Sequence, residues 1–209
     1  MMKALTLALG GAVLLVLSSC SEAPRPEEKK TAEAAKPAEP VTGRYALNQM
    51  YLAARAALGS DVEPLQCISI NLQEVKTVPG KAAAWRCTFV SARAGKAKDY
   101  TYSVVESMGN LHKGVFAGLD ESWSGPRGAA KPFIMAAIKT DTDAAYEVAA
   151  KKAKDYEKKN PGKSILFTLE KRDKFPDPAW RVIWGESVGT SNFSIFVDAS
   201  TGDYLETMR

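Results

Sequence analysis

The tripeptide Ala-Trp-Arg occurs at 84–86 and again at 179–181, and each copy opens a stretch with aromatic or β-branched residues at every second position. Alternation with a period of two is typical of a strand that buries one face. With one gap of two residues between the copies, Tyr102 aligns with Ile195. The repeat predicts two copies of an antiparallel strand meander.

Both copies end in a turn signal. Gly109-Asn110 and Gly202-Asp203 each follow a serine by two positions. Glycine takes the positive φ at the first central position of a type II′ turn without steric cost. We therefore expect a two-residue hairpin at each place.

One helix precedes each copy. Residues 44–60 carry apolar side chains at a spacing of three and four, and Gly59 ends the pattern. Residues 140–143 offer N-caps for a second helix, which the sequence Asn160-Pro161-Gly162 ends. The side chains expected to face a sheet are Leu47, Met50, Tyr51, Ala54, Ala57 and Leu58 in the first helix and Ala145, Ala149, Ala153 and Tyr156 in the second.

These patterns predict an α+β fold. Segments 64–75 and 163–175 supply further strands, and segment 118–132 is the expected joint. We expect two tandem helix-plus-antiparallel-sheet modules, residues 43–125 and 126–209, with the helices packed on one face of the sheet or sheets. Their length suits one ordinary domain or two small ones.

The first nineteen residues have the layout of an export signal. Lys3 precedes the uncharged run 4–18, which rises only about 22 Å as a helix, less than the ~30 Å hydrocarbon core. The quartet that ends at Cys20, Leu-Ser-Ser-Cys, resembles the bacterial lipobox. This resemblance implies that residues 1–19 are removed and that Cys20 carries acyl chains. Ser21 resembles the outer-membrane sorting case, and the outer face of the cytoplasmic membrane is the alternative.

Residues 20–42 predict a lipidated cysteine followed by a disordered tether. Segment 21–42 is rich in Ala, Pro, Glu and Lys and has no aromatic residue. It cannot bury enough apolar surface to offset its chain entropy. As a flexible coil it spans roughly 26 Å on average and about 70 Å at full extension.

Lipidation of Cys20 would leave Cys67 and Cys87 as a pair in an oxidising compartment. A disulfide between them would add about 3 kcal/mol by the chain-entropy relation. The alternation offers a counter-argument, because Cys67 alternates with Ile68 whereas Cys87 shares its face with Trp85. Direct pairing then requires a bulge, or the strands are not neighbours.

The second copy, residues 138–209, resembles the PepSY domain. The resemblance lies in "IKTDTDAAYEVAAKKA" (138–153), "AWRVIW" (179–184) and "IFVDASTGDYL" (195–205). The first copy departs from it, with Val105 in place of the aspartate. The resemblance implies a non-catalytic envelope module that restrains peptidases, and the tandem duplication is similar to the β-lactamase-inhibitor-protein architecture.

The chain lacks the usual catalytic and cofactor motifs. Its one histidine, His112, is expected in a surface loop rather than beside a reactive cysteine. No His-x-x-x-His, paired Cys-x-x-Cys or Gly-rich phosphate loop occurs, so we expect no cofactor and no metal. Residues 198–203 carry acids but lack the spacing of a calcium loop, and a turn is the better interpretation.

Charge is mildly positive and gives no nucleic-acid signature, with 23 bases and 19 acids in residues 43–209. Lys151, Lys154 and Lys158 line one helix face, which we expect to be solvated unless it meets an anionic surface. The aromatic side chains of the strands are expected to form the core, with a ligand groove as the alternative; they are Trp85, Trp180, Trp184, Phe193 and Tyr204.

The sequence therefore favours a non-catalytic, lipid-anchored envelope protein that binds or restrains a periplasmic partner, for which a peptidase is one candidate. A structural or assembly lipoprotein of the outer membrane is the second hypothesis. An enzyme that uses the aromatic face as a substrate pocket is the third.

Overall fold

The computed structural model describes residues 37–107 and 111–209. Each copy of the repeat consists of one helix and four strands, in that order. The first comprises α1 (Gly43–Leu58), β1 (Glu63–Ile70), β2 (Ala84–Ser91), β3 (Lys96–Ser103) and β4 (Gly114–Ser122). After the 3₁₀ turn η1 (Met135–Ala137), the second comprises α2 (Thr142–Lys159), β5 (Ile165–Glu170), β6 (Ala179–Trp184), β7 (Ser194–Asp198) and β8 (Tyr204–Met208).

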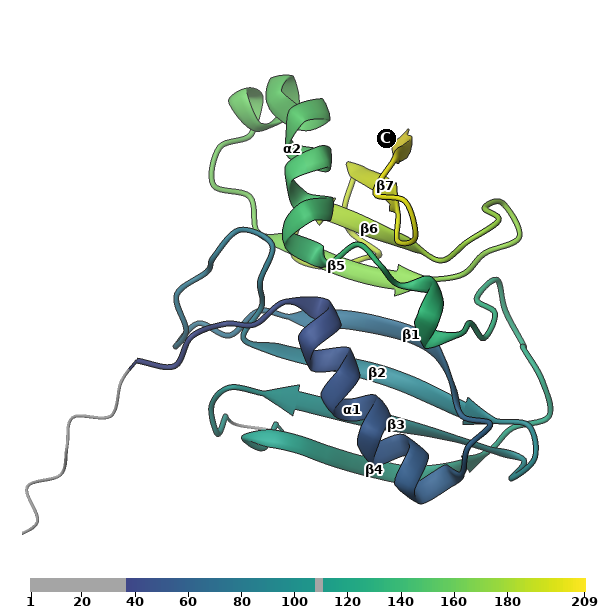
Figure 1. The fold of residues 1–209 in the computed structure, drawn as a ribbon. Coiled ribbons are helices and arrows are strands. Elements are labelled where there is room, and N and C mark those ends of the chain that lie inside the picture. Colours follow the sequence, from purple (N-terminus) through teal and green to yellow (C-terminus); the bar gives the residue numbers. More distant parts are fainter. Residues whose placement is uncertain (1–36, 108–110) are drawn as a thin grey trace, which may run out of the picture. The chain divides into compact units, whose positions relative to one another are not determined.

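The eight strands form one antiparallel sheet in the order β4-β3-β2-β1-β5-β6-β7-β8. The two copies meet where β1 pairs with β5, over the three register pairs that begin with Gln66 opposite Glu170. Both helices pack on the same face of this sheet (Figure 1), and their buried side chains join one hydrophobic core. The predicted α+β fold of two helix-plus-sheet modules is confirmed, and the modules share a single sheet.

The helices begin and end close to the predicted positions. Helix α1 ends at Leu58, and Gly59 takes a φ of 110°, a conformation that favours glycine. Helix α2 begins after Asp141, whose carboxylate accepts a hydrogen bond from the Thr142 N–H at 2.7 Å. The predicted inner stripes are buried except at Ala57, which is exposed, and at Tyr51 and Tyr156, which are half-buried.

The two repeated tryptophans meet where the copies join. Their rings lie 6.3 Å apart in an edge-to-face arrangement, and both side chains are fully buried. The Trp85 indole N–H donates to the Val41 carbonyl at 3.3 Å, and the Trp180 indole N–H donates to the Thr140 carbonyl at 2.9 Å. Each carbonyl lies two positions before the first residue of a helix. The Ala-Trp-Arg repeat is therefore a repeat of contacts as well as of sequence.

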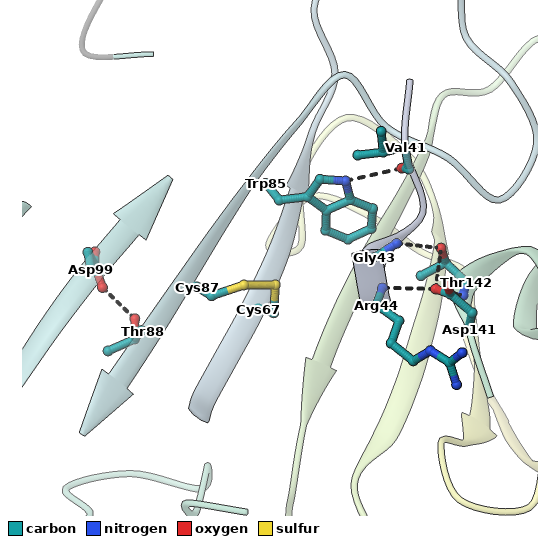
Figure 2. Close-up of a disulfide and its surroundings, with 10 residues drawn as sticks. All are labelled: Val41, Gly43, Arg44, Cys67, Trp85, Cys87, Thr88, Asp99, Asp141 and Thr142. Carbon is teal, nitrogen blue, oxygen red and sulfur yellow. Dashed lines mark hydrogen bonds between the residues drawn. A yellow bond between two sulfur atoms is a disulfide. The ribbon is translucent and has the colours of Figure 1, made fainter. Parts of the chain in front are cut away.

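The N-termini of the two helices share their capping groups beside these tryptophans (Figure 2). The Gly43 N–H donates to the Thr142 hydroxyl at 2.9 Å, and that hydroxyl donates to the Gly80 carbonyl at 2.6 Å. The Arg44 N–H donates to the Asp141 carboxylate at 2.9 Å. One carboxylate therefore stabilises the positive ends of both helices.

The predicted gap between the repeats is wrong. Trp85 pairs with Tyr102 and Trp180 pairs with Val197, so both partners stand 17 positions after their tryptophan. Tyr102 is thus equivalent to Val197 and not to Ile195. An alignment with a two-residue gap fits the pattern of the sequence as well as one without it, because side chains alternate between the two faces of a strand. A shift by two residues therefore leaves every side chain on the face to which it was assigned.

The predicted turns and joint also need correction. The connection from Asp198 to Tyr204 has five residues instead of two, although Gly202 does take a positive φ of 84°. The Asp198 carboxylate accepts hydrogen bonds from the N–H groups of Ser200 and Thr201, and these bonds favour the longer turn over a two-residue hairpin. The first-copy turn falls on 108–110, outside the described residues. Strand β4 includes residues 118–122, so the joint begins only at Trp123.

The tight packing at Gly43 leads to a stability prediction. A Cβ atom at this position would lie 2.6 Å from the Trp180 Cη2 atom and 3.0 Å from the Trp85 Cη2 atom. We expect Gly43→Ala to lower the free energy of unfolding in urea by about 2 kcal/mol, because the overpacked ring pair must move. Gly128→Ala is the control, since no atom lies within 4 Å of its Cβ position. Equal stability of the two variants would contradict the packing argument.

Candidate partner-binding surface

The helix-covered face of the sheet is filled by core side chains. Trp85, Trp180, Trp184 and Phe193 are at most 4% exposed, whereas Tyr204 is 38% exposed. The prediction that these aromatics form the core is confirmed for the first four. A pocket of ≈ 500 Å³ opens at the end of α2, where Tyr156 and Trp184 line it together with residues 161–164 and the β6–β7 loop. A more apolar surface lies on the other face of the sheet.

Cys67 and Cys87 form the disulfide, and they stand directly opposite each other in β1 and β2 (Figure 2). Both sulfur-bearing side chains are fully buried on the helix-covered face. The objection from sequence alternation fails because β1 turns Cys67 and Ser69 inward and leaves Ile68 half-buried on the other face. The Ser69 hydroxyl accepts a hydrogen bond from the Phe167 N–H at 2.8 Å, which offsets the burial of a polar group in the core.

A row of side chains crosses the other face of the sheet. In the first copy, Ile68, Arg86, Thr101 and Phe116 stand opposite one another on consecutive strands from β1 to β4. Arg86 and Phe116 are exposed, and Ile68 and Thr101 are half-buried. We define the open patch as these four side chains and their exposed or half-buried neighbours on the same face: Ile68, Ile70, Arg86, Thr88, Asp99, Thr101 and Phe116.

The same row is buried in the second copy. It continues through Thr168, Arg181 and Phe196, which are at most 6% exposed. Phe175, from the loop between β5 and β6, packs on Phe196 with ring centroids 5.4 Å apart. The same loop supplies Lys174, which forms an ion pair with Glu206.

Arg86 and Arg181 are therefore equivalent in sequence and opposite in exposure. The Arg181 guanidinium donates to the Ser194 hydroxyl at 2.9 Å and lies 5.5 Å from the Phe196 ring centroid. Burial lowers the pKa of Arg181, repulsion by Arg172 adds to this effect, and Glu170 opposes it. The sequence alone does not distinguish the two arginines, because the loop that covers the second half of the row decides which of them is exposed to solvent.

A groove of ≈ 460 Å³ adjoins the open patch. Leu65, Thr88 and Ala97 of the sheet form one wall, and the connector that follows β4 forms the other with Trp123 and Arg127. Thr88 belongs to both the groove and the open patch, so the two form one continuous surface. Aromatic residues and arginine are enriched in protein-binding surfaces, and this surface offers Phe116, Trp123 and Arg86.

Strand β4 is one edge of the sheet, and charged side chains surround it. The Asp120 carboxylate lies 2.7 Å from the Lys96 Nζ atom and 2.8 Å from the Lys98 Nζ atom. Hydrogen bonds from Lys96 and then Lys98 lower the pKa of Asp120 to about 2. A register shift between Lys98 and Tyr100 interrupts the pairing with β4. Charges and bulges of this kind hinder the addition of another strand.

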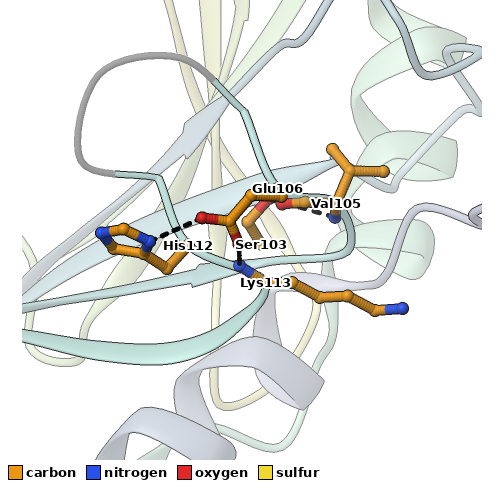
Figure 3. Close-up of polar contacts among 5 residues, drawn as sticks. All are labelled: Ser103, Val105, Glu106, His112 and Lys113. Atoms are coloured by element: carbon orange, nitrogen blue, oxygen red, sulfur yellow. Dashed lines mark hydrogen bonds and ion pairs between the residues drawn. The ribbon is translucent and has the colours of Figure 1, made fainter.

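His112 lies near the same edge, where the surface loop prediction placed it. Its Nδ1 atom is 2.6 Å from a Glu106 carboxylate oxygen, whose partner oxygen accepts from the Lys113 N–H at 2.9 Å (Figure 3). The hydrogen bond from the Lys113 N–H is the main cause that lowers the pKa of Glu106, and the hydrogen bond with His112 lowers it further. The His112 ring lies 4.6 Å from Phe116 of the open patch. In residues 37–107 and 111–209 no free thiol accompanies His112, because Cys67 and Cys87 are bonded to each other.

The remaining predicted residues are Asp198, the three lysines of α2 and Cys20. Asp198 is buried in the turn 199–203, as the turn interpretation requires, and the three lysines of α2 are exposed. Within residues 37–107 and 111–209, no three His, Cys, Asp or Glu side chains gather as metal ligands would. In the same residues, no helix has the length and apolar character needed to cross a bilayer. Cys20 lies outside the described residues.

Comparison with known proteins adds no relative to this picture. No family model matches the chain, and no curated protein and no solved structure shows significant similarity to it. The PepSY and lipobox resemblances therefore remain interpretations of the sequence.

The buried disulfide leads to a prediction for the cysteine-free variant. Because the bond closes a separation of 20 residues, we expect Cys67→Ala with Cys87→Ala to lower the free energy of unfolding by about 3 kcal/mol. Urea denaturation of the oxidised protein and of the variant measures the difference. A loss below about 1 kcal/mol would show that the crosslink contributes little to stability.

The Asp120 ion pairs lead to a pH prediction. The folded pKa of about 2 lies below the unfolded value, so this carboxylate stabilises the fold above pH ~4, and the contribution disappears as the pH falls toward ~2. We expect a carboxyl NMR titration of Asp120 to show this depressed pKa. The variant Lys96→Gln with Lys98→Gln should return the pKa toward ~3.9. An unchanged value in that variant would assign the shift to another cause.

Proposed function

We propose that this chain is a lipid-anchored, non-catalytic envelope protein that binds a periplasmic protein partner through the open patch. The anchor is the Cys20 thiol, with acyl chains in the outer membrane and the folded part facing the periplasm. A peptidase is the partner class that the PepSY resemblance of residues 138–209 favours.

An extracytoplasmic location is supported by the disulfide. Disulfides persist in oxidising compartments and are rare in the cytosol. The bond uses Cys67 and Cys87, which leaves Cys20 as the unpaired member of an odd count. An export signal that ends at this third cysteine accounts for both facts at once.

The binding role depends on one observation, the unequal cover of the sheet. The loop between β5 and β6 buries the second half of the row across the sheet, and the first half is open. The open half offers the aromatic ring of Phe116, the guanidinium of Arg86 and the aliphatic side chains of Ile68 and Ile70. Aromatic residues and arginine are enriched among the side chains that dominate binding energies, and a groove beside them can receive an anchor of the partner.

The alternative is an assembly lipoprotein whose sheet edge pairs with a membrane complex. Leu119 favours it, because this side chain on edge strand β4 is 89% exposed. The Lys96–Asp120–Lys98 cluster and the irregular register of β4 oppose it. We therefore place the partner on the open patch rather than on the edge.

Crosslinking in cells tests the open patch. A photoreactive amino acid at Arg86 or Phe116 of the full chain should yield a crosslinked envelope protein, which mass spectrometry identifies. The same probe at Leu52, which is 64% exposed on α1, is the matched control. Phe116→Glu with Arg86→Glu should abolish co-purification of that protein without a change in the urea midpoint.

Two outcomes would contradict the proposal. Crosslinks from Leu52 or from Leu119, with none from the two patch positions, would move the interface to α1 or to the β4 edge. An intact N-terminal methionine in the mature protein, found by mass spectrometry, would remove the anchor and the compartment. If the crosslinked protein is a peptidase, an assay of its activity with and without this chain decides between restraint and simple binding.

A further inference from the structure

The net charge of the folded part is concentrated in one place. Residues 151–163, the second half of α2 and the turn after it, hold six lysines and two acids. The rest of residues 43–209 holds 17 bases and 17 acids and is neutral. We define the lysine face by these side chains: Lys151, Lys152, Lys154, Lys158, Lys159 and Lys163.

All six lysines are exposed, and none takes part in an ion pair within the described part of the chain. Elsewhere in residues 43–209, four of the nine lysines form ion pairs, among them Lys96 and Lys98 with Asp120. The acid within the face, Asp155, is also exposed and pairs with none of them. Residues 151–163, with Asp155 and Glu157 counted, thus carry a formal charge of +4, and the lysines of the face have no ion-pair partner among the described residues.

The lysine face contains no arginine. Arginine binds a defined carboxylate or phosphate through two parallel hydrogen bonds, whereas lysine acts as a mobile, strongly hydrated point charge. A patch made only of lysine suits a diffuse anionic surface, such as a layer of lipid headgroups, better than one fixed anionic ligand.

The position of the lysine face is compatible with contact to a flat anionic surface. Helix α2 buries Ala145, Ala149 and Ala153 against the sheet, and Lys151, Lys154 and Lys158 occupy the opposite side of the helix. The open patch lies on the far side of the sheet from both helices. A surface that attracts the lysine face therefore leaves the open patch free.

We propose that the lysine face docks on anionic phospholipid headgroups and so orients the anchored protein with its open patch toward the periplasm. This inference rests on the proposed lipid anchor, which confines the folded part to within a tether length of the bilayer. Each lysine close to an anionic surface strengthens attachment by roughly fivefold, and salt reduces the effect beyond a Debye length of about 8 Å.

Lysine labelling on vesicles tests the inference. The full acylated chain is reconstituted into neutral phosphatidylcholine vesicles and into vesicles that also contain phosphatidylglycerol, and an amine-reactive reagent is added. We expect labelling of Lys151, Lys154 and Lys158 to fall about threefold or more on the anionic vesicles and to recover in high salt. Labelling of Lys76 and Lys113, exposed lysines of the first copy, should not change.

Matched variants separate position from total charge. In Lys151→Glu with Lys154→Glu and Lys158→Glu, the remaining lysines of the face should label equally on both kinds of vesicle. In the control, Lys76→Glu with Lys113→Glu and Lys139→Glu, the net charge changes by the same amount, and the three α2 lysines should stay protected.

The outcomes distinguish the two proposals. Equal labelling of the wild-type face on neutral and anionic vesicles, with the protein vesicle-bound throughout, would overturn the inference and leave the anchor intact. If the protein does not stay on neutral vesicles, the proposed anchor is rejected. If it then binds anionic vesicles and the variant Lys151→Glu with Lys154→Glu and Lys158→Glu does not, the inference about the lysine face still holds. If the α2 lysines are protected from labelling in cells but not on anionic lipid vesicles, the inference is overturned, and an acidic protein is the partner of the lysine face.

Discussion

The packing of Trp85 against Trp180 is the contact on which the single sheet depends. The strands at the junction share only three register pairs, whereas β2 and β3 within the first copy share eight. The two indoles, fully buried, and the shared helix caps at Asp141 and Thr142 add to this short seam. A glycine at position 43 is required because the rings leave no room for a Cβ atom.

Duplication supplies two equivalent sheet halves, and loops make them different. The loop 71–83 turns toward the helices, where Gly80 receives a hydrogen bond from Thr142. Its counterpart, 171–178, crosses to the other face and covers Phe196 with Phe175. The same strand pattern therefore yields a closed surface in the second copy and an open one in the first.

The two faces of the molecule carry different physical properties. The open patch combines apolar side chains with single charges, and the lysine face on the other side of the sheet combines mobile charges with no apolar group that penetrates a bilayer. The proposed partner binding and the proposed membrane contact use these different surfaces. Because they lie on opposite sides of the sheet, one protein can serve both without competition.

The sequence alone determined the fold class, both helices and the strand repeat, because periodicity and capping residues are local signals. It left the bond between Cys67 and Cys87 open, because the alternation of residues argued against direct pairing, and the structure shows the bond. It did not determine the register of the repeat, since a shift by two residues keeps every face. It also placed Arg86 and Arg181 in equivalent positions. Only tertiary structure decided that one arginine is exposed and the other buried, because burial depends on loops and contacts distant in the chain.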